Sequence, residues 1–556
     1  MQQDPGDAAR ARHRHASQRR GGAWRIGSMV CAGLAGIGGL GACLSMWGAR
    51  ARAEEQTKPD VVTTPTAAQA TSAVQSFLTS WSGSSLAAAA RATDDAAAAQ
   101  QALQGYATGL KASRVTFTNV VVGAPDPAVA HALRTTFHVS TMLQGDGTFS
   151  YDGVADTLVV NGKPVVHWRP SVLYPGLTSG QNLVFGSIPA TAATVVDRHG
   201  TVLTGKQYPS LTGIISALQS EYAQKAQISP GQGVKITDAS GKTVKVLKVN
   251  KPAVPGKISS TLDAATQAAA ESAVNDPHIK TTPTDVVAID YTTGQIRAVA
   301  FKGGDSALNG AAAPGSTMKM ITSAALMDKA GVKPTDKVPC VKTTLISGQT
   351  FHNFQMESDP SADLTKDFAI SCNTAFINEA TSKLHSGDLR AEARDVFGIG
   401  DWKIGVPTTD GNVPNENGSE NLIAAQAIGQ GQVTMNTLTM ASVVATIADG
   451  AFHQPIIVPG LAQRTAKQPI SATTSAYIRE MMVATATQSY GTAEPRMVGI
   501  PGGAKTGTAE TATGTNGWFA AYDTANHLAV DALAVGGKEG VFSAGYVARD
   551  VMLAPH

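Results

Sequence analysis

The chain has 556 residues, of which 43% are hydrophobic and 15% are charged. At about 150 residues per domain this length predicts about three folded units, and the composition excludes both a disordered chain and a polytopic membrane protein. Lysine and arginine number 44 against 42 aspartates and glutamates. A net charge of +2 gives no reason to expect nucleic-acid binding.

Charge is distributed unevenly near the N-terminus. Six arginines and two aspartates occupy residues 1–25, whereas the 24 residues of 26–49 carry no charge. As a helix at ~1.5 Å per residue this run is about 36 Å long, enough to cross a hydrocarbon core of about 30 Å. We therefore expect a basic cytoplasmic tail over 1–25, a single transmembrane anchor over 26–49, and an extracytoplasmic chain after Arg50.

Two processing alternatives to a retained anchor stay open. The sequence ending at Cys43 resembles a lipoprotein cleavage box, and the sequence ending at Ala53 resembles a signal-peptidase site. All three routes export the body of the chain.

Outside the anchor the only cysteines are Cys340 and Cys372. A disulfide between them and two separate free thiols are both open.

A linker over 50–65 precedes the first folded segment. Apolar residues at three- and four-residue spacings predict helices over 67–81 and 85–110. Short segments rich in valine, threonine and aromatic residues then predict strands over 114–122, 130–142, 149–160 and 163–173. Residues 66–173 are therefore expected to form an α+β domain.

The next segment, 174–255, is expected to be a small β-rich lobe. Hairpins are predicted over 194–203 and 234–249, because each of these segments carries an Asp and a Gly at its turn. From 256 to 556 helices and strands alternate in one large α/β unit. Helices are predicted over 316–330, 366–382, 436–448, 473–484 and 544–553, and strands over 286–290, 295–300, 502–508, 517–522 and 528–535.

A serine and a lysine stand at the start of one predicted helix. Pro314 and Gly315 break the chain there, so Ser316 lies near the helix N-terminus with Lys319 three residues further on the same face. A neutral lysine amine can activate a serine hydroxyl if its pKa falls from about 10.4. Burial and a neighbouring cation, for which Lys505 is the candidate, would lower that pKa.

Two more triplets follow in order, Ser371-Cys372-Asn373 and Lys505-Thr506-Gly507. Each is weak alone, but Ser-x-x-Lys, Ser-x-Asn and Lys-Thr-Gly together resemble the active-site set of the penicillin-recognising serine acyltransferases. Their context resembles the class B penicillin-binding proteins over 259–556. The segments that carry this likeness are Ala313-Pro314-Gly315-Ser316, Ser371-Cys372-Asn373-Thr374-Ala375-Phe376, Gly429-Gln430-Gly431 and Lys505-Thr506-Gly507-Thr508-Ala509-Glu510.

Upstream segments extend the resemblance. The two helices and sheet that end in His167-Trp168-Arg169-Pro170-Ser171 resemble the NTF2-like N-terminal domain of the methicillin-resistance-type subgroup. Residues 194–203 resemble the start of that family's non-catalytic lobe. The resemblance implies an α+β multidomain protein: a membrane helix, an NTF2-like domain, a β-rich dimerisation-type lobe and a serine β-lactamase-like transpeptidase domain with helices on both faces of its sheet. No segment resembles a glycosyltransferase domain, so a monofunctional enzyme is implied.

The resemblance also implies a role for each motif residue in a D,D-transpeptidase of peptidoglycan synthesis. Ser316 would attack the penultimate D-Ala carbonyl of a stem peptide, and Lys319 would take its proton. Ser371 and Asn373 would relay protons and hold the substrate amide, while Lys505 tunes the surrounding field. The other implied roles are carboxylate binding by Thr506 and Thr508, room for the substrate at Gly507, and an oxyanion hole from the main-chain N–H groups of Ser316 and Thr508.

The implied partners are stem peptides, inhibitory β-lactams, the cell membrane, and proteins of the division or elongation machinery; no cofactor, metal or nucleic acid is expected. One alternative is a D,D-carboxypeptidase or β-lactamase, in which water resolves the acyl-enzyme. A glutamate would have to activate that water, and the candidates are Glu357, Glu392, Glu416 and Glu420. A second alternative is a β-lactam sensor or scaffold, and the subgroup resemblance suggests low β-lactam affinity.

Overall fold

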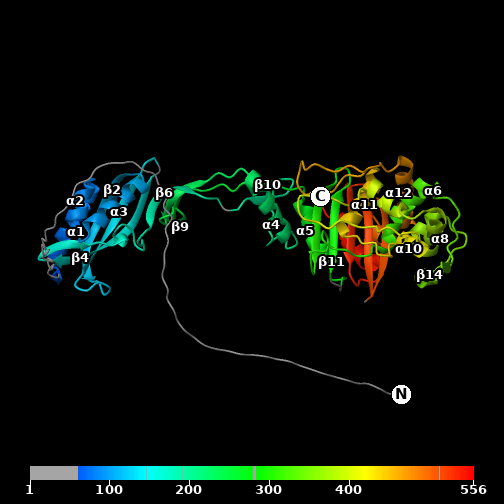
Figure 1. Ribbon diagram of the computed structural model, residues 1–556, viewed down its shortest axis with the longest axis horizontal. Coiled ribbons are helices and arrows are strands. Elements are labelled where there is room, and N and C mark those ends of the chain that lie inside the picture. The colour runs from blue at the N-terminus through cyan, green and yellow to red at the C-terminus, as the bar shows by residue number, and fades with distance from the viewer. Residues whose placement is uncertain (1–59, 146, 191, 280–282, 513, 556) are drawn as a thin grey trace, which may run out of the picture. The chain divides into compact units, whose positions relative to one another are not determined.

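The structure is a computed structural model that describes residues 60–145, 147–190, 192–279, 283–512 and 514–555 (Figure 1). The predicted cytoplasmic tail, the anchor over 26–49 and most of the linker over 50–65 lie outside these residues. Among the described helices, none combines the length and the apolar character needed to span a bilayer.

The first described domain packs helices on an antiparallel sheet. The sheet has the order β1-β4-β3-β2, with β5 also paired to β4. Aromatic side chains including Phe77, Trp81, Tyr106 and Phe137 fill the core between the helices and the sheet. The elements are β1 (Val62–Thr63), α1 (Ala67–Ser82), α2 (Leu86–Arg91), α3 (Ala96–Gly109), β2 (Ala112–Pro125), β3 (Leu133–Leu143), β4 (Thr148–Val160) and β5 (Lys163–His167).

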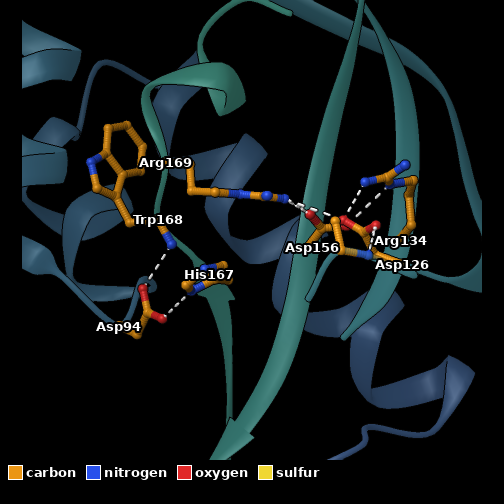
Figure 2. Close-up of polar contacts among 8 residues, drawn as sticks. Asp94, Asp126, Arg134, Asp156, His167, Trp168 and Arg169 are labelled. Carbon is orange, nitrogen blue, oxygen red and sulfur yellow. Dashed lines mark hydrogen bonds and ion pairs between the residues drawn. The ribbon is translucent and has the colours of Figure 1, made fainter. Parts of the chain in front are cut away.

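The single helix predicted over 85–110 is wrong, because the chain breaks it into α2 and α3. The Asp95 side chain caps α3 by accepting the N–H of Ala98 at 3.0 Å. Asp94 turns away from the helix, and its carboxylate accepts hydrogen bonds from the His167 ring at 2.6 Å and the Trp168 N–H at 2.7 Å (Figure 2). These contacts join the break to the end of β5.

Beyond β5 the chain is held by a group of paired charges (Figure 2). The carboxylates of Asp126 and Asp156 are both only 1% exposed, and each contacts the guanidinium groups of Arg134 and Arg169. Burial of a carboxylate is costly unless it is paired in this way. The strand predicted over 163–173 therefore ends at His167, and the next residues form the 3₁₀ turn η1 (Pro170–Val172).

The segment 174–255 contains one predicted hairpin, one irregular one and one unexpected helix. β8 (Gly231–Thr237) and β9 (Thr243–Lys251) form the hairpin predicted over 234–249, beside β6 (Asn182–Ile188). The hairpin predicted over 194–203 is reduced to a single bridge, because β7 (Thr194–Val196) pairs in parallel with β10 (Lys257–Ser259). The helix α4 (Leu211–Tyr222) was not predicted. Some buried residues here, such as Phe185, join the core of the first domain, whereas others, such as Leu211, join that of the C-terminal domain.

The C-terminal domain is organised around a five-stranded antiparallel sheet of order β12-β11-β17-β16-β15 (Figure 1). Alternate residues of the central strands enter two different cores. Val287 packs in the cluster that contains residues of α6 (Lys319–Ala330), α11 (Thr437–Asp449) and α12 (Ala472–Thr487). Val286 packs in the cluster that contains residues of α5 (Ala264–Ala273) and α14 (Ala544–Met552). Helices therefore cover both faces, as expected. The strands are β11 (Thr284–Asp290), β12 (Gln295–Lys302), β15 (Gly502–Thr511), β16 (Gly514–Asp523) and β17 (Leu528–Ala534).

The helices predicted over 436–448, 473–484 and 544–553 lie close to α11, α12 and α14, whereas α5 and the helices over 388–391, 420–427 and 494–497 were not predicted. The other two predicted helices are interrupted. The helix predicted over 316–330 begins with the 3₁₀ turn η3 (Gly315–Met318), and the helix predicted over 366–382 breaks at Ser371. The remaining elements are α5 (Ala264–Ala273), α6 (Lys319–Ala330), β13 (Thr343–Ile346), β14 (Gln349–His352), η4 (Phe354–Met356), α7 (Leu364–Ala369), α8 (Asn373–Lys383), α9 (Asp388–Ala391), η5 (Glu392–Val396), α10 (Glu420–Ala427), α11 (Thr437–Asp449), α12 (Ala472–Thr487), α13 (Glu494–Met497), η6 (Gly540–Phe542) and α14 (Ala544–Met552).

Candidate active site

The tight turn η3 positions Ser316 between strand β15 and a second turn. Gly315 has a φ of 53°, and its N–H donates to the carbonyl of Gly429 at 3.0 Å. A Cβ at Gly429 would lie 2.0 Å from the Gly315 oxygen, and a Cβ at Gly315 would lie 2.5 Å from the Thr508 oxygen. Only glycines allow this approach of three main chains, which places Ser316 beside the edge strand β15.

The amine of Lys319 is the centre of the site. Its Nζ lies 2.9 Å from Ser316 Oγ, 2.7 Å from the Ser371 carbonyl oxygen and 2.8 Å from Asn373 Oδ1. The Ser371 hydroxyl is slightly further, at 3.3 Å. Lys319 is fully buried as the first residue of α6. The structure therefore brings together the serine, the lysine and the Ser-x-Asn motif that the sequence singled out.

Lys505 approaches the same group from β15. Its Nζ donates to the Ser371 hydroxyl at 2.9 Å and to the Thr506 carbonyl at 2.9 Å. The Ser371 hydroxyl thus lies between the two amines. Burial lowers the pKa of Lys505 to about 7. Burial, and then the neighbouring charge of Lys505, lowers the pKa of Lys319 well below its ordinary value.

The neighbours of Lys319 indicate where its hydrogens lie when it is neutral. The Ser371 carbonyl and Asn373 Oδ1 can only accept hydrogen bonds, so they take both N–H groups of a neutral amine. The remaining lone pair then faces Ser316 Oγ. The Asn373 amide has this orientation because its Nδ2 donates to the His352 carbonyl at 3.2 Å. The geometry suits proton transfer from Ser316 to Lys319.

The Ser-x-Asn motif stands in a short break between α7 and α8. Ser371 has a φ of 67°, in the left-handed region that a non-glycine residue rarely adopts. A disulfide joins Cys372, the middle residue of the motif, to Cys340, which is one of the two alternatives left open by the sequence. Backbone strain of this kind persists only where surrounding contacts enforce it.

Asn353 is one residue that the sequence analysis missed. It is almost fully buried, and its Oδ1 accepts the N–H groups of Asn373 at 2.8 Å and Thr374 at 2.9 Å. Its Nδ2 donates to the carbonyls of Val341 and Glu357 at 2.7 and 2.8 Å. Asn353 therefore caps α8, whose own N-cap residue makes no side-chain cap. Nothing in the local spacing of the sequence marks this contact.

The Lys-Thr-Gly motif occupies the edge strand β15. A Cβ at Gly507 would lie 2.9 Å from the Pro314 oxygen and 3.0 Å from the Thr317 and Trp518 side chains, so no larger residue fits there. Thr508 is partly exposed, whereas Thr506 is 7% exposed and its hydroxyl lies 2.6 Å from that of Thr492. Thr492 was also missed by the sequence analysis.

The four candidate glutamates are separated by the fold. Glu416 binds the Gly387 N–H at 2.6 Å, Glu420 contacts Ser347, and Glu392 is buried beside Lys329. Glu357 differs, because the charge of Lys319 acts on its carboxyl group. Burial raises the pKa of Glu357, and the charge of Glu539 raises it further.

One group of potential metal ligands is found in the described part of the chain. It consists of Cys340, Asp367 and Cys372, which lie within 4.8 Å of one another. The two sulfurs form the disulfide and are not thiolates, so this group does not have the donors of a metal site.

The fold and the site agree with the penicillin-recognising serine acyltransferases, which the motifs resemble. Residues 285–553 match the protein family described as "Penicillin binding protein transpeptidase domain". The matched residues include Ser316, Ser371 and Lys505, so the match agrees with the resemblance that the motifs indicated.

The chain is also similar to curated proteins whose names state an activity. The chain is 32% identical over 224 residues to the peptidoglycan D,D-transpeptidase PbpA of Mycolicibacterium smegmatis, a match that covers 36% of this chain and 43% of the relative. It is 27% identical over 261 residues to PbpA of Mycobacterium tuberculosis, covering 42% of this chain and 51% of the relative. The chain thus spans about half the length of the curated relatives it matches.

Two solved structures share the fold. One comes from work described as "Structural coordination of polymerization and crosslinking by a peptidoglycan synthase complex", with a TM-score of 0.53 and 20% identity over 67% of this chain and 91% of that chain. The other is penicillin-binding protein 3 of Mycobacterium tuberculosis, with a TM-score of 0.51 and 20% identity over 66% of this chain and 96% of that chain.

Proposed function

We propose that the chain is a class B penicillin-binding protein that cross-links peptidoglycan as a D,D-transpeptidase. The observation that carries the proposal is the position of the Lys319 amine, within 2.9 Å of Ser316 Oγ and bound to acceptors of the Ser-x-Asn motif. The names of the PbpA relatives support the same activity.

The reaction has two halves. Ser316 Oγ forms a bond to the penultimate D-Ala carbonyl of a stem peptide while its proton passes to Lys319. The amide C–N bond then breaks, and the leaving D-Ala amine receives a proton through Lys319 and the Ser371 hydroxyl. An acceptor amine next attacks the ester and restores the Ser316 hydroxyl. The main-chain N–H groups of Ser316 and Thr508 stabilise the oxyanion in each half.

The remaining motif residues serve recognition in this proposal. Lys505 supplies positive charge next to Ser371, and Thr506 and Thr508 bind the terminal carboxylate of the donor. A β-lactam would enter the same reaction, but the amine that is released when its ring C–N bond breaks stays tethered to the acyl group, so the ester with Ser316 persists.

The proposal is tested by the intact mass of the full-length chain during incubation with benzylpenicillin. One lasting adduct of one drug mass is expected on the natural protein and none on Ser316→Ala. The Ser382→Ala variant is the matched control, because the Ser382 hydroxyl bonds only carbonyls of its own helix. An unmodified natural protein would contradict the proposal and favour a scaffold.

Hydrolysis of the acyl-enzyme by water is the alternative that the same experiment detects, and Glu357 is the candidate glutamate on whose carboxyl group the charge of Lys319 acts. A β-lactamase would show an adduct that disappears while the drug is consumed. In that case Glu357→Gln is expected to make the adduct persist.

The proposal extends to the rest of the chain. The three helices packed on a curved antiparallel sheet support an NTF2-like domain of the methicillin-resistance-type subgroup over 66–173. The uncharged run over 26–49 supports a single-pass membrane anchor with the catalytic domain outside the cytoplasm. Division or elongation proteins are the partners we propose.

Fractionation of cells that produce the full chain tests the anchor. If the anchor is present, the chain is expected in the membrane fraction after a high-salt wash.

A further inference from the structure

Thr492 connects the two motifs that face Ser316. It lies between α12 and α13, and its N–H donates to the carbonyl of Ala369 at 3.1 Å. Its hydroxyl lies 3.2 Å from the same carbonyl and 2.6 Å from the Thr506 hydroxyl. Ala369 is the last residue of α7, two positions before Ser371. A single side chain thus joins the Ser-x-Asn segment to the Lys-Thr-Gly strand.

Each of the two hydroxyls has one proton, so the direction of their hydrogen bond matters. In one arrangement Thr492 donates to Ala369 and Thr506 donates to Thr492, which leaves Thr506 with no proton for a ligand. In the other, Thr492 donates to Thr506, and the Thr506 proton is free. In both arrangements the main-chain N–H of Thr492 donates a hydrogen bond to the Ala369 carbonyl.

A carboxylate ligand selects between these arrangements, because it can only accept hydrogen bonds. We propose that Thr492 is a positioning residue that aims the Thr506 hydroxyl at the terminal carboxylate of the donor substrate. Thr492 fixes the rotamer of Thr506 before binding and donates to its oxygen after binding. The Thr506 oxygen then has a donor in the complex, which matters because Thr506 is 7% exposed and an unpaired buried oxygen is unfavourable. The inference rests on the proposed function, since it assumes that Ser316 is acylated by carboxylate-bearing substrates.

The first test compares variants of Thr492 in the full-length chain. Thr492→Val keeps the shape and the main-chain N–H but removes the hydroxyl, whereas Thr492→Ser keeps the hydroxyl. The second-order rate of acylation by benzylpenicillin is expected to fall about five- to ten-fold in Thr492→Val, the effect of one hydrogen bond of roughly 1 kcal/mol. Thr492→Ser is expected to recover most of that rate.

A second probe separates positioning from a general structural role. The methyl ester of benzylpenicillin lacks the carboxylate, so its acylation rate is expected to be the same in the natural protein and in Thr492→Val. Equal losses with both probes would show that Thr492 only supports the fold and would overturn the inference. The matched control is Thr487→Val, because the exposed Thr487 hydroxyl bonds only Val483 of its own helix.

A double-mutant cycle tests whether Thr492 acts through Thr506. In a Thr506→Val background, Thr492→Val is expected to cause no further loss of the benzylpenicillin rate. A full additional loss would overturn the inference. If the natural protein is not acylated by benzylpenicillin at all, the proposed function itself fails, and the inference fails with it. Acylation of the natural protein with unchanged rates in Thr492→Val overturns the inference alone.

Discussion

Lys505 is a buried lysine that loses its proton more easily than an exposed lysine. Burial lowers its pKa to about 7, and the pKa of Lys319 lies well below its ordinary value. Acylation needs a neutral Lys319 and a charged Lys505. The acylation rate therefore rises with pH as Lys319 loses its proton, and it falls as pH rises through about 7 because Lys505 then loses its charge. The second-order rate with benzylpenicillin, measured from pH 5 to pH 9, is therefore expected to fall on the alkaline side as pH rises through about 7.

The alkaline side of this profile is assigned to Lys505, which can be checked directly. Arginine stays protonated throughout this range, so in Lys505→Arg the fall above pH 7 is expected to disappear even though the maximal rate is lower. A rate for the natural protein that continues to rise to pH 9 would contradict the assignment.

Gly429 supports the turn that presents Ser316. Its φ is 75°, and a Cβ there would lie 2.0 Å from the Gly315 oxygen. We expect Gly429→Ala to displace η3 and to slow acylation at least ten-fold, with a loss of stability beyond the ~1 kcal/mol of an unfavourable φ. The control is Gly499→Ala, which has a φ of 81° but open space around its Cβ. If the two variants behave alike in acylation rate and in Tm, the clash has no effect on the turn.

At the scale of elements, the disulfide fixes the break between α7 and α8. Cys340 and Cys372 are separated by 32 residues, and closing a loop of that size stabilises the fold by roughly 3 to 4 kcal/mol in the chain-entropy account. We expect the double variant Cys340→Ala, Cys372→Ala to lower the denaturant midpoint accordingly and to slow acylation, because Cys372 is adjacent to Ser371 and Asn373.

The comparison should be made with and without a reductant. Reduction is expected to lower the midpoint of the natural protein toward that of the double variant and to leave the variant unchanged. The same shift in both proteins would mean that the reductant acts elsewhere.

The sequence predicted the sheet strands and most helices of the C-terminal domain, because their apolar patterns are regular. It failed where side chains from distant segments interrupt a helix. The patterns over 85–110 and 366–382 are each continuous, but contacts of Asp94 with the end of β5 break the first, and the left-handed Ser371 breaks the second. α4 was missed because the segment around it carries turn residues typical of hairpins.

The residues of the site differ in whether a sequence motif marks them. The motif order was enough to bring Ser316, Lys319, Ser371, Asn373 and Lys505 together in a prediction, and the structure places their side chains in contact. Asn353 and Thr492 could not be predicted, because each acts through hydrogen bonds to segments that only the fold brings close. Such contacts leave no spacing pattern.

At the scale of the whole molecule, buried carboxyl groups make stability depend on pH. Burial raises the pKa of Asp285 to about 7 and that of Glu392 to about 8, and it raises the pKa of Asp531 well above its ordinary value. The unfolded chain titrates these groups near pH 4. Their contribution is therefore complete below about pH 4 and is lost as pH rises through 7 to 8. We expect the free energy of unfolding to fall between pH 5 and pH 8.

Glu392 is the group to isolate in this experiment, because its side chain is fully buried beside Lys329 and the charge of Asp328 raises its pKa in addition to burial. Glu392→Gln is expected to flatten the decrease between pH 5 and pH 8, since glutamine has no proton to lose. Denaturant titrations of both proteins at the two pH values measure the difference. An equal slope in both would show that Glu392 does not contribute to it.

The strand order has a consequence for synthesis on the ribosome. β11 pairs with β17, and Lys505 lies 189 residues after Ser316 (505 − 316), on a strand that closes the sheet late. At roughly 5–20 residues per second, about 10 to 40 seconds pass between the emergence of the serine and that of the second lysine. During that time Ser316 and Lys319 have been translated, but Lys505, whose charge lowers the pKa of Lys319, has not. The proposed active site is thus complete only after Lys505 has been translated.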